Sequence, residues 1–198
     1  MKRIQLKNSI LQDVAMEAAL TLSKGGLVVA PFDTVYGILV DPSDNLAVGR
    51  VNEIKGRPGS KTIGLATCSA AEISRITYMD IDKEEFIAKK APGKYTFILK
   101  EHGQNSISDL CKRDGNLAIR VPDSQLILEI IRLSGGLVAQ TSANKSGQPN
   151  CYSIEDIENQ FIGLDQFDLI IDGGLLAESL PSELWDLTGV TPRQIERS

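Results

Sequence analysis

Three cations lie close together in the sequence KGRPGSK, at Lys55, Arg57 and Lys61. Two glycines and a proline interrupt this stretch, so it is expected to form an irregular loop whose side chains turn toward one centre. Arginine offers a planar fork for a phosphate or carboxylate, and lysine offers a mobile point charge. The segment therefore predicts an anion-binding loop. The alternative is a solvated helix end, where cations favour the helix dipole, and Lys55 fits that alternative better than the other two.

A second anion-binding candidate is the polar turn that follows an apolar strand expected at residues 137–141. Thr141, Ser142, Asn144 and Ser146 supply hydroxyls and an amide in the sequence TSANKSG. Successive backbone N–H groups and hydroxyls in such a turn form a nest for an anion. By composition alone, an ordinary hydrophilic loop is the better explanation of this segment.

Two more polar residues are placed by strands. Thr34 follows a short apolar strand expected at residues 27–30, and polar residues at the carboxyl ends of strands commonly contact ligands in α/β folds. An ordinary turn explains that segment equally well. Arg120 belongs to a strand expected at residues 117–121, whose alternation puts apolar side chains on one face and Ala118 with Arg120 on the other. Arg120 then faces either solvent or a ligand.

Strands and helices alternate along the whole chain, which predicts an α/β (α+β) class and a single domain spanning residues 1–198. Asn8 or Ser9 is expected to cap the first helix, and Ser43 the second. Helices are expected at residues 9–23, 43–56, 69–76, 82–90, 124–134 and 153–161. Strands are expected at residues 27–30, 36–40, 63–67, 95–100, 117–121, 137–141, 167–171 and 184–187.

Composition and isolated residues exclude several classes of protein. The chain is 42% hydrophobic and 24% charged, as in ordinary globular proteins, and it contains no apolar run that could span a bilayer. Cys68, Cys111 and Cys151 have no CxxC spacing, which argues against disulfides or zinc and fits a cytoplasmic location. His102, the single histidine, lies in a polar stretch and is expected on the surface, so a histidine-based triad is not expected. A net charge of −5 disfavours a dedicated nucleic-acid-binding protein.

Taken together, the polar segments resemble the YrdC-like family, the threonylcarbamoyl-AMP synthases, in a short single-domain form. Motifs of that family occur in order as PFDTVYG at 31–37, KGRPGSK at 55–61, PGKYTFIL at 92–99, RVP at 120–122, SANKSGQP at 142–149 and PSELWDLT at 181–188. One such motif is a weak signal, whereas six in order along nearly the whole chain are specific.

The resemblance implies a twisted mixed sheet flanked by helices around a basic concave cavity. It also implies a nucleotidyltransferase that forms threonylcarbamoyl-AMP and pyrophosphate from L-threonine, bicarbonate and ATP, for the threonylcarbamoyladenosine modification of tRNA at position 37. The implied partners are tRNA or double-stranded RNA and a downstream threonylcarbamoyl-transfer machinery. A carbamate is already an anionic nucleophile, so the reaction needs positioning and electrostatic stabilisation more than a strong base.

The resemblance also assigns roles to residues. The implied catalytic residues are Lys55, Arg57, Ser142 and Asn144. The implied ATP contacts are these four together with Lys61, Ser146 and Arg197. The implied threonine contacts are Thr34, Arg120, Thr141 and Ser182, with Arg120 suited to the carboxylate. Mg²⁺ is expected to be carried by the ATP phosphates, because the sequence shows no carboxylate cluster for a dedicated site.

Five positions depart from the family pattern: Phe32, Thr62, Ala66, Asn150 and Glu183. They leave the phosphate site better supported than the amino-acid pocket. One alternative is a YciO-like paralogue with weak or altered activity, which shares the PGKYTFILK segment but typically lacks the K-x-R and S-x-N residues kept here. The other is an RNA-binding module that uses the same cavity, against which the net charge and the lack of aromatic residues near the basic loop both argue.

Overall fold

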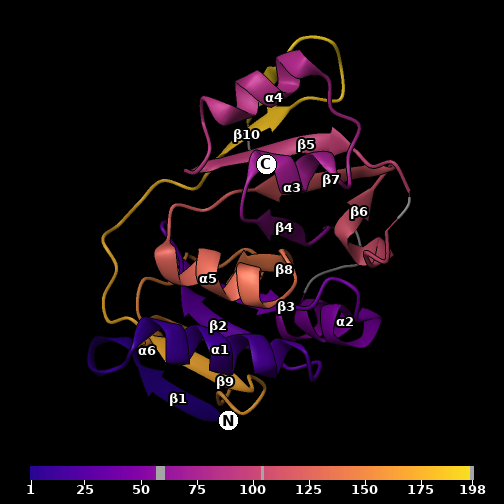
Figure 1. Ribbon diagram of the computed structural model, residues 1–198. Coiled ribbons are helices and arrows are strands. Elements are labelled where there is room, and N and C mark those ends of the chain that lie inside the picture. Colours follow the sequence, from indigo (N-terminus) through magenta and orange to yellow (C-terminus); the bar gives the residue numbers. More distant parts are fainter. Residues whose placement is uncertain (57–60, 104, 197–198) are drawn as a thin grey trace.

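One twisted mixed sheet runs through the molecule (Figure 1), in a computed structural model that describes all residues except 57–60, 104 and 197–198. Its strands lie in the order β1-β9-β2-β3-β8-β4-β7-β5-β10-β11, and β6 pairs with β7. Strand β8 is antiparallel to both of its neighbours, whereas β1 and β9, β2 and β9, β4 and β7, and β5 and β10 pair in parallel. Figure 1 shows β1 and β9 at one end of the sheet and β10, beneath α4, toward the other. The predicted mixed sheet flanked by helices is confirmed.

The elements expected from the sequence are all present within two residues of their predicted bounds. The strands are β1 (Lys2–Gln5), β2 (Val28–Pro31), β3 (Tyr36–Val40), β4 (Gly64–Thr67), β5 (Tyr95–Lys100), β6 (Lys112–Arg113), β7 (Asn116–Arg120), β8 (Leu137–Ser142), β9 (Leu169–Asp172), β10 (Glu183–Asp186) and β11 (Arg193–Ile195). The helices are α1 (Leu11–Leu22), α2 (Asn45–Ile54), α3 (Ala70–Ser74), α4 (Ile81–Ala88), α5 (Gln125–Leu133) and α6 (Ile154–Gln160), with short 3₁₀ turns η1 (Leu6–Asn8) and η2 (Asp109–Cys111).

Strands β1, β6 and β11 were not predicted, because all three are short and polar. Strand β1 is in addition placed by β9, a partner far away in the sequence. In β1, the guanidinium of Arg3 and the amide of Gln5 both donate to Asp172 Oδ2 of β9, at 2.7 and 2.6 Å. No local pattern reveals such a pairing. Tertiary contacts therefore decide the edge strand β1.

Two predicted helix caps were wrong. Residues Leu6–Asn8 form the turn η1, so α1 begins after Ile10, which makes no side-chain cap bond. In α2 the cap is Asp44, whose Oδ1 accepts from the backbone N–H groups of Leu46 and Ala47 at 2.9 and 3.0 Å. The Ser43 hydroxyl instead donates to Asp41 Oδ1 in an Asx turn. Aspartate and serine are equally favoured as helix caps, so the sequence alone did not distinguish Asp44 from Ser43.

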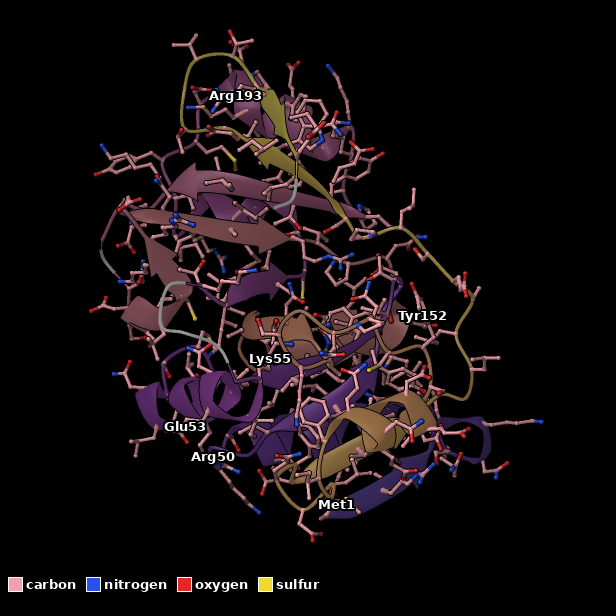
Figure 2. The ribbon with its side chains drawn as sticks, turned by 180° about the vertical axis from the view of Figure 1, so that it is seen from behind. Met1, Arg50, Glu53, Lys55, Tyr152 and Arg193 are labelled. Atoms are coloured by element: carbon pink, nitrogen blue, oxygen red, sulfur yellow. The ribbon has the colours of Figure 1, made fainter. Side chains whose placement is uncertain are left out.

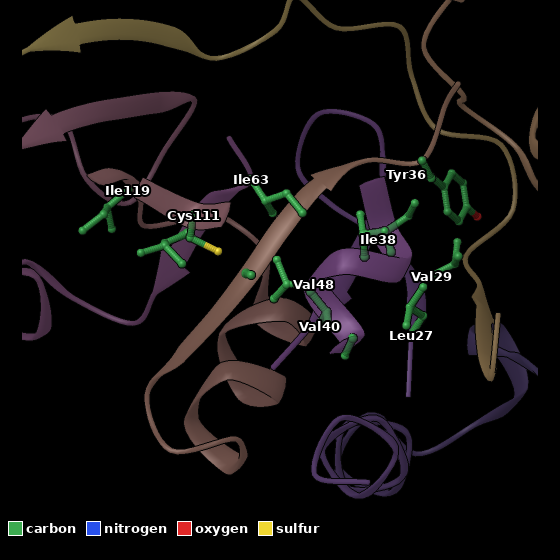
Figure 3. Close-up of a cluster of buried hydrophobic side chains, with 14 of the residues drawn as sticks. Leu27, Val29, Tyr36, Ile38, Val40, Val48, Ile63, Cys111 and Ile119 are labelled. Carbon is green, nitrogen blue, oxygen red and sulfur yellow. The ribbon is translucent and has the colours of Figure 1, made fainter. Parts of the chain in front are cut away.

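The two faces of the sheet carry separate apolar cores. Helices α1 and α5 lie together on one face (Figure 1) and pack against alternate residues of β2 and β8, including Val28, Ala30 and Val138. On the other face, α2 and α6 cover a second cluster. Figure 3 shows part of it, with Ile38 and Val40 of β3 beside Val48 of α2. This arrangement packs β3 and β8 between two apolar cores, and several candidate site residues lie at or near the ends of the strands.

Candidate functional site

A cavity of about 300 Å³ opens on the face of the sheet that carries α5. Ala66 of β4 and Val138 of β8 pack against α5, whereas Gly64 and Gln140, two residues away on the same strands, line the cavity. Side chains two apart on a strand share a face, so the cavity continues the α5 side of the sheet where no apolar cluster covers it. The residues predicted from sequence that line it are Thr34, Arg120, Thr141, Ser142 and Ser182.

A buried ion pair forms part of the cavity wall. Arg120 Nη2 donates to both carboxylate oxygens of Asp33 at 2.7 Å, and also contacts the Gly93 carbonyl at 3.2 Å. Arg120 is only 4% exposed, so the expectation of a solvated arginine on a half-exposed sheet is excluded. The Asp33 carboxylate, which follows β2, also accepts from the Asp123 backbone N–H at 3.1 Å. Burial lowers the pKa of the Arg120 guanidinium, and the Asp33 carboxylate opposes that shift.

The guanidinium of Arg120 is not fully used by these contacts. Its Nε is buried and has no hydrogen-bond partner among the described residues. A buried donor without a partner is costly, and such groups in native structures commonly mark a ligand, ion or water position. The alternation predicted for residues 117–121 is confirmed, because Leu117 and Ile119 enter the apolar core while Arg120 lines the cavity.

Hydroxyl groups line the cavity around Arg120. The hydroxyls of Thr96 on β5 and Ser182 lie 2.8 Å apart and are buried. Ser182 ends the segment 173–182, which runs along the side of the molecule from β9 to β10 (Figure 1). Tyr152, labelled in Figure 2, holds this segment through its hydroxyl, which donates to the Ser179 carbonyl at 3.2 Å. Residues distant in sequence are therefore fixed side by side around one cavity.

The polar turn after β8 is ordered by its own hydrogen bonds. Ser142 Oγ donates to Asn144 Oδ1 at 2.5 Å, and Asn144 Nδ2 donates to the Gln148 carbonyl at 2.6 Å. Ala143 N–H donates to the Tyr36 carbonyl at 2.8 Å, which ties the start of the turn to β3. These hydrogen bonds give the turn a defined conformation, which an ordinary hydrophilic surface loop would not require. We call residues 142–149 the polar turn from here on.

Lys55, labelled in Figure 2, contacts the polar turn. Its side chain is buried, with the residue 1% exposed. Its Nζ donates to the carbonyl oxygens of Ser142 and Asn144, the latter at 2.5 Å, and lies 3.3 Å from Asn144 Oδ1. The Ser146 N–H donates in turn to the Lys55 carbonyl at 2.9 Å. Lys55 follows α2 directly, but it is no solvated helix end, because its charge is directed into the turn. The described geometry thus joins Lys55, Ser142, Asn144 and Ser146 in one network.

Three further predicted residues are not part of the described network. Arg57 and Arg197 lie outside the described residues. Lys61 is exposed and is not among the described residues that line the cavity. Arg120 is the one charged side chain among the described residues lining it, so the wall described here is polar rather than densely basic. His102 packs edge-on against Tyr78, with ring centroids 5.9 Å apart, away from the cavity.

Sequence reasoning missed several cavity residues. Gln140 and Thr96 line it without having been singled out, and Thr62 and Asn150 were noted only as departures from a pattern. Gln140 carries the one signal that sequence could have used, since it is a polar residue inside the otherwise apolar start of β8. The others face the cavity only because of tertiary placement.

Phe32, another departure, does not line the cavity. Its ring packs over Gly37, where an added Cβ would lie 2.6 Å from Phe32 Cε2. Phe32 is 6% exposed and belongs to the apolar cluster under α1 and α5. The substitution therefore fills core space that Gly37 leaves open.

Two of the three cysteines offer no nucleophile. Burial raises the pKa of Cys111 to about 12, and burial with a contribution from Asp156 raises the pKa of Cys151 to about 12. A thiol with such a pKa is protonated at neutral pH and inert.

No cluster of three or more histidine, cysteine or acidic side chains suited to a metal occurs among the described residues. No helix in the described part of the chain is long and apolar enough to cross a membrane.

Comparison with known proteins places this geometry in a family. The Sua5_yciO_yrdC family model, described as "Telomere recombination", matches residues 20–198. The chain belongs to the Sua5/YciO/YrdC family. A Klebsiella pneumoniae threonylcarbamoyl-AMP synthase is 30% identical to it over 195 residues, which cover 96% of this chain and 100% of that protein. The mouse threonylcarbamoyl-AMP synthase is 31% identical over 170 residues, covering 85% of this chain and 59% of the mouse protein. The chain thus spans about three fifths of that relative.

Solved structures of the same family share the fold. Pyrococcus abyssi Sua5 complexed with L-threonine superimposes with a TM-score of 0.85 at 28% identity, covering 98% of this chain and 56% of that protein. Escherichia coli YciO superimposes with a TM-score of 0.83 at 27% identity, covering 98% and 93%. The predicted membership of the YrdC-like family is confirmed.

Proposed function

We propose that this chain is an L-threonylcarbamoyladenylate synthase, a nucleotidyltransferase that uses L-threonine, bicarbonate and ATP. The observation that carries the proposal is the Arg120 guanidinium, buried against Asp33 yet with an unpartnered Nε, in the wall of a hydroxyl-lined cavity. A small zwitterion that carries its own hydroxyl fits such a cavity chemically. Relatives named threonylcarbamoyl-AMP synthase, and a relative complexed with L-threonine, support this choice of substrate.

In the proposed complex, Arg120 binds the threonine carboxylate. Thr34, Thr141 and Ser182 contact its hydroxyl and amino groups, since all three line the same cavity. The cavity volume of about 300 Å³ suits one amino acid and part of a phosphate chain. Asp33 keeps the guanidinium in a single orientation and offsets its charge until the substrate enters.

The ATP phosphates are proposed to bind the polar turn, through Ser142, Asn144 and Ser146, with Arg57, Lys61 and Arg197 as further contacts. Ser142 belongs both to this turn and to the cavity wall, so it stands where threonine and phosphate meet. Lys55 adds positive charge from below, because its ammonium donates to the Ser142 and Asn144 carbonyls. Charge fixed in place in this way stabilises a developing anion without reorganisation.

The proposed reaction has two bond-forming steps. The threonine nitrogen attacks carbon dioxide derived from bicarbonate and loses a proton, which gives an N-carboxylate. An oxygen of that carboxylate then attacks the α-phosphorus of ATP, and the bond to pyrophosphate breaks. Because the nucleophile is already an anion, the main task is to hold two anions together, as in phosphoryl transfer generally. The lack of a histidine near the cavity is consistent with this mechanism.

Mg²⁺ is proposed to arrive with ATP as its phosphate counter-ion. The described residues offer no acidic cluster that could hold it independently. Mg²⁺ retains several waters and commonly binds through substrate phosphates.

Pyrophosphate release tests this function. Purified protein should release pyrophosphate from ATP only when threonine and bicarbonate are both present, and a panel of amino acids should show a preference for threonine. Turnover that is independent of threonine would contradict the substrate assignment. Product capture by a downstream threonylcarbamoyl-transfer machinery, acting on tRNA in the cytoplasm, is the proposed fate of the adenylate.

Two other functions remain as outcomes of that test. Similarity to YciO leaves open a paralogue with weak or altered activity, and the polar turn network with Lys55 favours the synthase over it. An RNA-binding module would bind tRNA or double-stranded RNA with strong salt dependence and release no pyrophosphate.

A further inference from the structure

The second half of the polar turn is held by the side chain of Gln160, at the end of α6. Gln160 Oε1 accepts from the Lys145 backbone N–H at 2.9 Å, and Gln160 Nε2 donates to the Pro149 carbonyl at 2.8 Å. One amide thus spans the turn from its fourth residue to its last residue. The two bonds fix the orientation of the amide, because the Lys145 group can only donate and the Pro149 group can only accept.

Helix α6 is a rigid support for that amide. A capping box joins Ser153 and Asp156 at its start, and Ile154 and Ile157 are buried in the core. Within the turn, Gln148 N–H donates to the Lys145 carbonyl at 3.0 Å, and Gly147 adopts a φ of +80° at the tip. The tip itself is exposed and has no core packing, so its shape depends on these few polar bonds.

We propose that Gln160 is a positioning residue that clamps the polar turn in the shape that binds the ATP phosphates. The proposal rests on the function proposed above. Gln160 lies on the outer side of the turn and is not among the described residues lining the cavity, so it acts through Lys145 and Pro149 rather than on the substrate. Without it, the segment from Lys145 to Pro149 would lose two of the hydrogen bonds that fix its shape, and ordering this segment would cost affinity when phosphate binds.

Two variants of Gln160 and one matched control test the clamp. Gln160→Met keeps the side-chain length and removes both hydrogen bonds. Gln160→Glu keeps the acceptor, removes the donor to Pro149 and adds one negative charge. Asn159→Asp makes the same amide-to-acid change at the neighbouring exposed position, whose side chain forms no hydrogen bond with the described residues. Comparing the two acidic variants separates the lost donor from the added charge.

The readouts are the ATP and threonine dissociation constants from calorimetry and the amide hydrogen-exchange rate at Lys145 from NMR. Both Gln160 variants should bind ATP about tenfold more weakly, as expected for the loss of one or two hydrogen bonds, and should bind threonine as the parent protein does. Exchange at Lys145 should accelerate in Gln160→Met. Asn159→Asp should match the parent protein in all three measurements.

Three results would overturn the clamp: unchanged exchange at Lys145, unchanged ATP affinity in both Gln160 variants, or an equal loss in Asn159→Asp. A general loss of folding would appear instead as weakened threonine binding and a lowered Tm. Failure of the parent protein to bind ATP would refute the proposed function and the phosphate role of the turn. The exchange measurement would then still decide whether Gln160 orders the turn.

Discussion

Arg120 Nη2 lies 2.7 Å from both carboxylate oxygens of Asp33, and the two side chains are 5% and 6% exposed. A pair so deeply buried is stabilising only while both partners are present, because either charge alone has lost its hydration. The pair joins β7 to the segment after β2, and so connects two walls of the cavity.

Asp33→Asn should therefore lower the free energy of unfolding by about 3–5 kcal/mol and weaken threonine binding, since the guanidinium loses its anchor. Urea denaturation and threonine titration are the measurements. The matched control is Asp114→Asn, which breaks a pair with Arg113 whose side chains are 75% and 89% exposed. That change should cost less than about 0.5 kcal/mol. Equal effects of the two substitutions would show that burial of the pair is unimportant.

Lys55→Met should both destabilise the protein and abolish ATP binding. Methionine fills the buried space but leaves the carbonyls of Ser142 and Asn144 without their donor, at a cost of about 2 kcal/mol or more. Lys61→Met removes an exposed cation from the same region and should leave stability unchanged while weakening ATP binding modestly. Thermal unfolding and calorimetric ATP titration distinguish them. A stable Lys55→Met protein that only loses phosphate affinity would mean that the ammonium acts on the ligand alone.

Gly37→Ala should destabilise the protein by about 1–3 kcal/mol, because the new Cβ would lie 2.6 Å from the Phe32 ring in a packed core. Replacing the ring by the smaller leucine side chain, in the double variant Phe32→Leu/Gly37→Ala, should recover part of that lost stability. Gly49→Ala is the control: nothing lies within 4 Å of its added Cβ and it lies inside α2, so it should stabilise by about 0.5–1 kcal/mol. The measurement is the denaturant midpoint of the parent protein, Gly37→Ala, the double variant and Gly49→Ala. If the double variant recovered no stability, a residue other than Phe32 would be the one that the new Cβ contacts.

Asp186 should contribute to the acid sensitivity of the protein. Hydrogen bonds from the hydroxyl and backbone N–H of Thr188 lower the pKa of the Asp186 carboxyl below its ordinary value. A depressed folded-state pKa stabilises the fold above the unfolded pKa, and this contribution is lost as pH falls through the folded pKa. Thr188→Val should raise the pKa of Asp186, seen by NMR titration, and should reduce stability more at pH 7 than at pH 2. A titration curve unmoved by the substitution would refute this origin of the shift.

The sequence predicted much of the fold because the local signals agreed with the tertiary structure. The apolar runs at residues 27–30 and 137–141 correspond to strands β2 and β8. Glycine and serine residues beside such runs predicted the strand ends to within two residues of the observed bounds. Alternation in β7 was sufficient to place Arg120 opposite the apolar core.

The sequence could not predict partners that lie far apart along the chain. Asp33 and Arg120 are separated by 87 positions, and Lys55 and Ser142 by the same number. Lys55 was expected either in an anion-binding loop or at a solvated helix end, whereas the structure buries it against the polar turn. Gln160 belongs to no sequence motif, and its contact with the polar turn arises because α6 lies beside that turn.

The strand order has a consequence for how the protein is made. Cavity residues run from Thr34 to Leu184, and central strand β8 separates β3 from β4 although it is synthesised long after both. A nascent chain leaving the ribosome therefore holds β3 and β4 without the strand that joins them, and folding depends on contacts of high sequence separation. The proposed threonine site is complete only after almost the entire chain has emerged. Ligand capture during translation would thus report completed folding.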